Sequence, residues 1–182
     1  MEISKAFLLK SFPFLKVFFR IFTHKGKTGQ WYFVSREDEP KVHAEKKKPD
    51  AVIIVGIKDG HVVLTSEFRV PIGAREIGFP AGLIDKDETV EAAAIREFRE
   101  ETGMELEILS KSPPHLYSSA GMTNESVQIV FGRASGEPNL SGNEATEDIE
   151  VMLIPQDKIQ EMLYDETVAF GAKAWCILYG FI

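Results

Sequence analysis

The sequence contains a single cysteine, Cys176, in 182 residues. This count excludes an intrachain disulfide and a thiolate metal cluster, and it predicts a reducing compartment, the cytoplasm. Histidines are also few, and they show no ligand spacing to one another, so we expect them to be structural: His24, His43, His61 and His115. No internal repeat or low-complexity tract is present, which excludes fibrous and repeat architectures.

An excess of basic charge is lacking as well, because the formal net charge is -7 at pH 7. A general nucleic-acid binder needs a basic surface to neutralise phosphates, so this balance argues against that class. A nucleotide-sized substrate remains compatible with it, since divalent metal ions can supply positive charge locally. The length suits one well-buried domain with a small extension at one end.

Long apolar runs are also missing. The segment Phe7 to Phe22 is rich in Phe, Leu and Ile, but Lys10, Lys16 and Arg20 interrupt it, so a membrane span is not expected. No small-residue cleavage site follows, which argues against a signal peptide. Two interpretations remain for this segment: a packing or dimerising extension, and a basic amphipathic strip that touches a membrane surface.

The chain is predicted to divide at a surface linker, Lys46 to Asp50, into an N-terminal β region (residues 1–48) and a main domain (residues 49–182). Just after it, Asp59-Gly60 separates two β-branched runs, Ala51 to Ile57 and Val62 to Glu67, which is a strong hairpin signal. Further strands are expected at Gln30–Ser35, Lys41–Glu45, Arg75–Leu83, Ser126–Arg133 and Ile149–Ile154, and further helices at Asp157–Leu163 and Thr167–Gly180. This mixture predicts an α/β sandwich around a mixed β-sheet.

The most informative segment is an acidic helix predicted at Thr89 to Thr102, with Gly103 as its C-terminal cap. Its residues Glu97, Glu100 and Glu101 stand at i, i+3 and i+4, so they share about 100° of one helix face. Carboxylate oxygens on one face suit the hard cations Mg²⁺ and Mn²⁺. Three glutamates alone would favour the simpler interpretation, a solvated acidic face. We expect Ile95 and Phe98 to hold the opposite side against the core.

The residues around these glutamates favour the metal-binding interpretation. They match every fixed position of the pattern G-x5-E-x7-R-E-U-x-E-E-x-G-U, where U is bulky and apolar: Gly82, Glu88, Arg96, Glu97, Phe98, Glu100, Glu101, Gly103 and Met104. This segment resembles the signature of the Nudix hydrolases, although an aliphatic residue is more usual at Phe98. The resemblance implies the α/β/α Nudix sandwich, here with an N-terminal β extension.

The resemblance also implies a role for each motif residue. Glu97, Glu100 and Glu101 would bind Mg²⁺ (or Mn²⁺), with the backbone carbonyl of Ala81 as a further ligand. Arg96 would hold the carboxylates in place. Three residues would be structural: Gly82 at a tight turn, Glu88 as a contact to Arg96 or to an outer metal, and Gly103 as the helix cap.

The metal ions would neutralise the charge of a pyrophosphate and activate a water molecule. In enzymes of this family the general base is often on an acidic loop outside the motif. Here the loop Gly142 to Asp148 offers Glu144 as base and Glu147 as metal ligand or alternative base. Ala145 stands where related loops often carry a carboxylate. A plain surface acid is the alternative for each.

Three segments resemble the ADP-ribose and nucleoside diphosphate sugar pyrophosphatases within this family. Phe68-Arg69-Val70-Pro71 resembles their "QFR-x-P" segment, which implies that Arg69 binds substrate phosphates. Phe79-Pro80-Ala81-Gly82 resembles "LPAG", with Gly78 in place of the usual glutamate. Leu116 to Glu125 resembles "YPSPG-x-x-x-E", with Ala120 in place of the second proline, a position associated with ADP-ribose preference.

Gln30 to Arg36 resembles the strand that these enzymes exchange across a homodimer. An aromatic side chain there, Trp31, can stack on the nucleobase. With Arg36, Arg69 and Glu125 it completes the implied substrate-binding set. A plain core aromatic is the alternative for Trp31.

The predicted function is hydrolysis of the pyrophosphate bond of nucleoside diphosphate sugars by a cytoplasmic homodimer. The partner is a small nucleotide and not a nucleic acid. Two alternatives stand beside this function: a nucleoside triphosphate pyrophosphohydrolase and a non-catalytic nucleotide-sugar sensor. Silent relatives commonly lose a metal-binding glutamate, whereas this sequence keeps all three.

Overall fold

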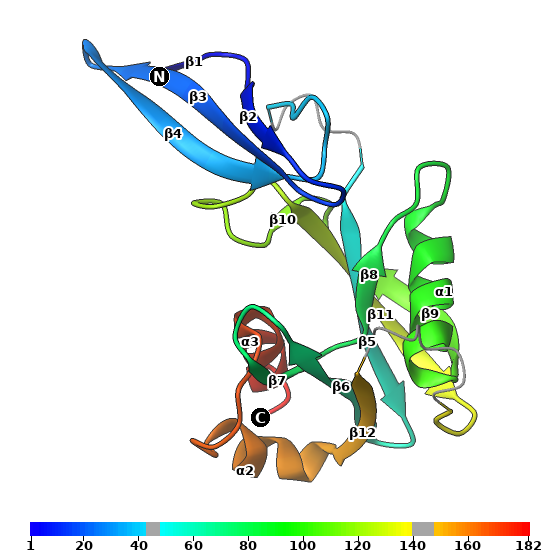
Figure 1. The fold of residues 1–182 in the computed structure, drawn as a ribbon. Coiled ribbons are helices and arrows are strands. Elements are labelled where there is room, and N and C mark those ends of the chain that lie inside the picture. Colours follow the sequence, from blue (N-terminus) through cyan, green and yellow to red (C-terminus); the bar gives the residue numbers. More distant parts are fainter. Residues whose placement is uncertain (43–47, 140–147) are drawn as a thin grey trace. The chain divides into compact units, whose positions relative to one another are not determined.

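The computed structural model describes residues 1–42, 48–139 and 148–182 (Figure 1). The chain folds into two compact units. The first comprises residues 1–51 together with 113–127, and the second comprises residues 52–112 and 128–182. The later segment 113–127 therefore belongs with the N-terminal β region. The division into functional domains at residue 48 stays a prediction.

The first unit is built on a four-stranded antiparallel sheet. Its strands are β1 (Glu2–Ile3), β2 (Phe7–Ser11), β3 (Lys16–His24) and β4 (Lys27–Ser35). Strand β4 pairs with the whole of β3, so β1 and β2 follow one another along the opposite edge of β3. Between them, the Ser4 hydroxyl accepts a hydrogen bond from the Ile21 N–H at 2.9 Å, which maintains the ladder across the break.

The segment Phe7 to Phe22 is thus mainly two β-strands and their connection. Phe18 on β3 is buried, and its ring stacks on that of Phe33 from β4 at a centroid distance of 5.7 Å. Lys25 and Gly26 connect β3 to β4 with φ values of 48° and 74°, the two left-handed conformations of a type I′ hairpin turn. This packing fits the interpretation of the segment as a packing extension, at least for its inward-facing side chains.

The other sheet has eight strands among the described residues, with β10, β11, β5, β6 and β12 in this order, β9 beside β11, β8 beside β5 and β7 beside β6. Their bounds are β5 (Ala51–Lys58), β6 (His61–Arg69), β7 (Ala74–Gly78), β8 (Ala81–Leu83), β9 (Glu105–Lys111), β10 (Leu116–Tyr117), β11 (Ser126–Ser135) and β12 (Ile149–Pro155). The Asp59-Gly60 hairpin is confirmed, with φ values of 47° and 76°.

The second unit carries helices on both sides of its strands (Figure 1). Helix α1 (Val90–Thr102) packs on one side against β8 and β9. On the other side, α2 (Ile159–Leu163) contacts α3 (Ala172–Tyr179), which packs against β7. The layered α/β architecture predicted from the sequence is confirmed. Within the described residues, no helix is long and apolar enough to span a membrane.

Several predicted boundaries were wrong. The strand Arg75–Leu83 is two strands, β7 and β8, because Phe79 and Pro80 interrupt it. The helix expected at Thr167–Gly180 begins only after Gly171. The helix expected at Asp157–Leu163 is α2 preceded by a short 3-10 turn, Gln156–Lys158. Of the strand expected at Lys41–Glu45, Lys41 and Val42 are not in a strand, and the remainder lies outside the described residues.

Helix α1 is fixed at both ends and along its inner face. The Thr89 hydroxyl accepts from the Ala92 N–H, and Gly103 caps the other end with φ 70°. Phe98 is fully buried, and its ring lies where a Cβ on Gly56 would approach within 2.7 Å. The expectation that Ile95 shares this face was wrong, since its side chain is 39% exposed. The inner face is instead lined by Ala93, Ala94 and Phe98.

We expect Phe98→Ala to lower the free energy of unfolding by about 3–5 kcal/mol, because it removes a fully buried aromatic side chain and leaves a cavity. Urea denaturation followed by circular dichroism measures the change. Ile95→Ala on the same helix is the control, with an expected loss of under about 1 kcal/mol. Equal losses in the two variants would contradict the assignment of Phe98 as the anchor of α1.

Candidate active site

Of the three glutamates expected to bind the metal, two lie against the backbone of β8. A Cβ on Gly82 would overlap the Glu97 carboxyl group, so only glycine permits this approach. Gly82 does not adopt a left-handed conformation, and its role is this close contact and not the tight turn expected from the sequence. One turn later on α1, Glu101 is only 8% exposed and accepts from the Ala81 N–H at 3.3 Å. The side of α1 nearest β8 is therefore acidic.

Arg96 joins the carboxylates of the motif. Its Nε and Nη2 donate to the two oxygens of Glu88, each at 2.9 Å. Its Nη1 donates to both Glu97, at 2.8 Å, and Glu100, at 3.1 Å. Nη2 also reaches the Leu83 carbonyl at 3.0 Å. The hydrogen bonds that Arg96 donates to Glu88, followed by its interactions with Glu97, raise the pKa of Arg96 above its usual value against the opposing effect of burial.

Of the two roles expected for Glu88, the structure shows the contact to Arg96, and a contact to an outer metal stays a prediction. In the structure Glu88 contacts Arg96, and its Oε2 also accepts from the Asp85 N–H at 3.2 Å. Glu88 thus fixes the loop that precedes α1 to the arginine in the middle of the helix. The remaining motif residue, Gly103, has no room for a side chain, because a Cβ would overlap the backbone of Asn139.

The motif carboxylates fit a divalent metal ion by donor type. Glu97, Glu100 and Glu101 offer oxygen atoms from one helix face, and the side chain of Glu100 is half exposed, which suits Mg²⁺ with retained waters. Among the described residues, however, no three acidic, histidine or cysteine side chains converge on one point as a metal cage. Glu97 and Glu100 turn toward Arg96, and Glu101 turns toward Ala81. A carboxylate can accept several partners, so the hydrogen bonds to Arg96 and Ala81 are compatible with the same carboxylates binding a metal.

Arg69, at the end of β6, lies between two carboxylates. Its Nη1 donates to Glu67 at 2.6 Å and its Nε donates to Glu76 on β7 at 3.3 Å. The side chain is 47% exposed. A phosphate at Arg69 would compete with both glutamates, so the proposed phosphate contact remains a prediction.

A second arginine, Arg75, was not selected from the sequence, and it is bound at Asp148, where the acidic loop ends. Arg75 Nη1 donates to the Asp148 carboxylate at 2.8 Å, and its Nε donates to the Ser66 hydroxyl at 3.1 Å. The hydrogen bond that Arg75 donates to Asp148 raises the pKa of Arg75. The contact joins residues 73 positions apart in the chain, so only the pairing of β6 with β7 and β12 shows it. Glu144 and Glu147, the candidate bases, lie outside the described residues.

The other predicted substrate residues belong to the first unit. The Trp31 indole N–H donates to the Gly121 carbonyl at 3.1 Å, and Arg36 Nε donates to Glu125 at 3.1 Å. The structure therefore brings Arg36 and Glu125 together as an ion pair. It also places the loop that resembles "YPSPG-x-x-x-E" beside β4, where Val34 N–H donates to the Met122 carbonyl at 2.9 Å.

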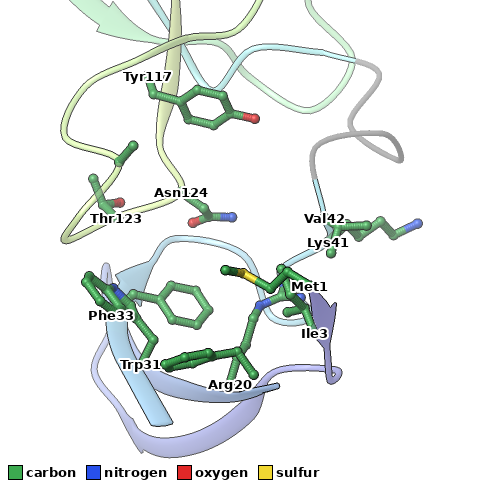
Figure 2. Close-up of a pocket in the computed structure, with 12 residues that line it drawn as sticks. Met1, Ile3, Arg20, Trp31, Phe33, Lys41, Val42, Tyr117, Thr123 and Asn124 are labelled. Atoms are coloured by element: carbon green, nitrogen blue, oxygen red, sulfur yellow. The ribbon is translucent and has the colours of Figure 1, made fainter. Parts of the chain in front are cut away.

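A pocket of about 550 Å³ opens within the first unit between its sheet and this loop. Figure 2 shows Trp31, Phe33 and Arg20 on the sheet side, with Tyr117, Thr123 and Asn124 facing them from the loop. Ala120 also lines the pocket. The volume lies in the range of small-molecule sites, and the walls are largely aromatic and aliphatic. The effect of the departure at Ala120 on ligand choice stays a prediction.

The fold and the acidic helix define an α/β domain with a carboxylate-rich site. A family model described as the NUDIX domain matches residues 47–173. A nudix hydrolase of Caenorhabditis elegans is 33% identical over 145 residues, which cover 75% of this chain and 64% of that protein. An ADP-ribose pyrophosphatase of Bacillus subtilis is 30% identical over 134 residues, which cover 70% of this chain and 72% of that protein.

An ADP-sugar pyrophosphatase of Mus musculus is 35% identical over 118 residues, which cover 62% of this chain and 51% of that protein. The chain thus spans less than two thirds of the nematode and mouse relatives. A crystal structure of an ADP compounds hydrolase shares the fold, with a TM-score of 0.74 and 22% identity over 98% of this chain and 91% of the other. The chain belongs to the Nudix family, as its motif predicted.

We expect Gly82→Ala to lower the affinity for Mg²⁺ by about tenfold to a hundredfold, because the new methyl group displaces the Glu97 carboxylate. Isothermal titration calorimetry measures the affinity. Gly78→Ala is the matched control, since a Cβ there meets nothing within 4 Å. Unchanged Mg²⁺ binding in Gly82→Ala would show that the position of Glu97 does not govern metal affinity.

We expect Arg96→Lys to lower the free energy of unfolding by about 1–3 kcal/mol, because a lysine cannot bridge Glu88 and the two glutamates of α1 at once. Thermal and urea denaturation measure the loss. Arg99→Lys is the control on the same helix: Arg99 is exposed and pairs with Glu105, so its change is expected to be about 0.5 kcal/mol or less. If Arg96→Lys left the free energy of unfolding unchanged, a planar guanidinium would not be needed to hold the carboxylates.

Proposed function

We propose that this protein hydrolyses the pyrophosphate bond of nucleoside diphosphate sugars to a nucleoside monophosphate and a sugar phosphate. The observation that carries the proposal is the complete set of motif carboxylates on α1, two of which are fixed against β8. The relatives named ADP-ribose and ADP-sugar pyrophosphatase support the substrate class. The ADP compounds hydrolase shares the fold alone.

In this proposal Glu97, Glu100 and Glu101 hold Mg²⁺, or Mn²⁺ in its place. The bound metal would neutralise the pyrophosphate charge and make a water molecule acidic enough to react near neutral pH. Arg96 keeps Glu97 and Glu100 on the same side of the helix, and Ala81 N–H orients Glu101. A general base from Glu144 or Glu147 completes the proposal.

The pocket of the first unit is our candidate for nucleobase recognition. Trp31 lines its sheet side, and Asn124 offers amide groups from the facing loop. An aromatic face binds a flat base by stacking, while an amide can hydrogen-bond its edge. Neither contact distinguishes the sugar, so the choice among nucleoside diphosphate sugars is left to experiment. The proposed assembly is a homodimer that acts in the cytoplasm.

The experiment is a panel of nucleotides incubated with Mg²⁺, with phosphate release coupled to a phosphatase. The panel contains ADP-ribose, ADP-glucose, GDP-mannose, UDP-glucose, a diadenosine polyphosphate and the common nucleoside triphosphates. Turnover concentrated on the diphosphate sugars supports the proposal. Turnover confined to triphosphates overturns the substrate class, and silence across the whole panel favours the sensor alternative.

On the best substrate of the panel, we expect Glu101→Gln to lower kcat by about a hundredfold or more, since a neutral amide is a much weaker ligand for a hard cation. The fold should be retained, because glutamine has the same shape. Glu105→Gln, which changes an exposed glutamate just beyond α1, is the control and should keep full activity. Activity that survives Glu101→Gln would rule out metal binding by this carboxylate as the basis of turnover.

A further inference from the structure

The connection between β2 and β3 presents an unusually apolar surface. From Leu8 to Leu15 eight consecutive residues are exposed, and five of them are leucine or phenylalanine. Phe14 is the most prominent, with 82% of its surface accessible. Contiguous exposed apolar residues are rare in proteins that bind nothing there. We refer to residues Leu8 to Leu15 as the β2–β3 tip.

The tip lies in the most basic part of the chain. Between Ile3 and Arg36 no acidic residue occurs, although the whole chain has a net charge of -7. The basic residues in this interval are Lys5, Lys10, Lys16, Arg20, Lys25, Lys27 and Arg36. Such a local excess attracts anionic surfaces.

Two of these lysines are available next to the apolar residues. Lys10 lies over the ring of Phe12 at 5.9 Å, and Lys5 lies over the ring of Phe7 at 5.7 Å. Within the described part of the chain, neither lysine forms an ion pair. Lys16 differs, since it pairs with Asp38 at 3.0 Å. Lys5 and Lys10 therefore place positive charge beside aromatic rings. This combination suits the boundary between lipid headgroups and acyl chains.

The backbone of the tip is also suited to a medium with little water. The Phe12 N–H already donates to the Leu15 carbonyl at 2.9 Å. Pro13 has no N–H to satisfy. Unsatisfied backbone donors are the main cost of placing a loop in lipid, and neither Phe12 nor Pro13 adds one.

We propose that the β2–β3 tip binds the surface of an anionic lipid bilayer, with Phe12 and Phe14 inserted at headgroup depth and Lys5 and Lys10 facing lipid phosphates. The charge distribution favours this occupant over a second copy of the chain bound tip to tip. A symmetric contact through the tip would bring surfaces of the same positive charge together, whereas an anionic bilayer neutralises them. The proposal does not depend on the nucleotide chemistry of the second unit.

Co-sedimentation of the full chain with vesicles tests the proposal. Phosphatidylcholine vesicles are compared with vesicles in which part of the lipid is phosphatidylserine. We expect binding that rises with the phosphatidylserine fraction and falls with added salt. Phe14→Trp should in addition show a blue-shifted fluorescence gain on the anionic vesicles, which reports insertion beyond surface adsorption.

Two variants separate the apolar and the charged contributions. Phe12→Ser with Phe14→Ser should weaken binding by about tenfold or more. Lys5→Gln with Lys10→Gln should weaken it by about fivefold for each charge removed. Tyr164→Ser, which removes an exposed aromatic ring from the second unit, is the control and should bind as the parent does. All five substituted positions are exposed, and circular dichroism tests whether each variant is folded.

Three results would overturn the proposal. The parent chain could fail to bind phosphatidylserine vesicles, or the tip variants could bind as well as the parent. The third concerns the mass in solution. If the parent is a dimer that does not bind vesicles, and Phe12→Ser with Phe14→Ser is a monomer, then the tip serves contact between copies of the chain.

Discussion

The close packing of α1 against β8 is the constraint on which the site depends. Gly82 has no side chain, and the Glu97 carboxylate occupies the space that a Cβ would fill. Glu101 reaches the neighbouring Ala81 N–H from the next turn of the helix. Carboxylates held this close to a protein core are costly without partners. Arg96 supplies the compensating charge and joins the loop before α1 to the helix through Glu88.

The same packing explains how the helix tolerates like charges on one face. Repulsion between glutamates at i, i+3 and i+4 costs a few tenths of a kcal/mol for each pair. A buried Phe98 and caps at Thr89 and Gly103 stabilise α1 by more than this. Tertiary contacts thus maintain an acidic surface that an isolated helix would not favour. A cation at this surface would relieve the repulsion, which connects the energetics of the helix to its proposed chemistry.

The two units differ in charge, and they therefore suit different ligands. The second unit concentrates carboxylates around α1 and uses arginines mainly as their internal partners, as Arg75 and Arg96 illustrate. The sheet of the first unit is basic and aromatic, with a pocket beside Trp31 and an exposed tip at Phe14. Charge segregation of this kind is invisible in the net charge of the chain. It becomes apparent when the charges are counted segment by segment along the chain.

Local patterns in the sequence were sufficient for the acidic helix, its glycine cap, the Asp59-Gly60 hairpin and the Nudix motif, because helix periodicity and turn conformation depend on neighbouring residues. The sequence did not reveal the β2 and β3 strands, whose apolar residues show no clear alternation, or the exposure of Ile95. Tertiary structure alone decided that Gly82 makes room for Glu97 and that Arg75 binds Asp148. Both depend on which backbone atoms meet when strands and helices pack, and residues far apart in the chain determine that register.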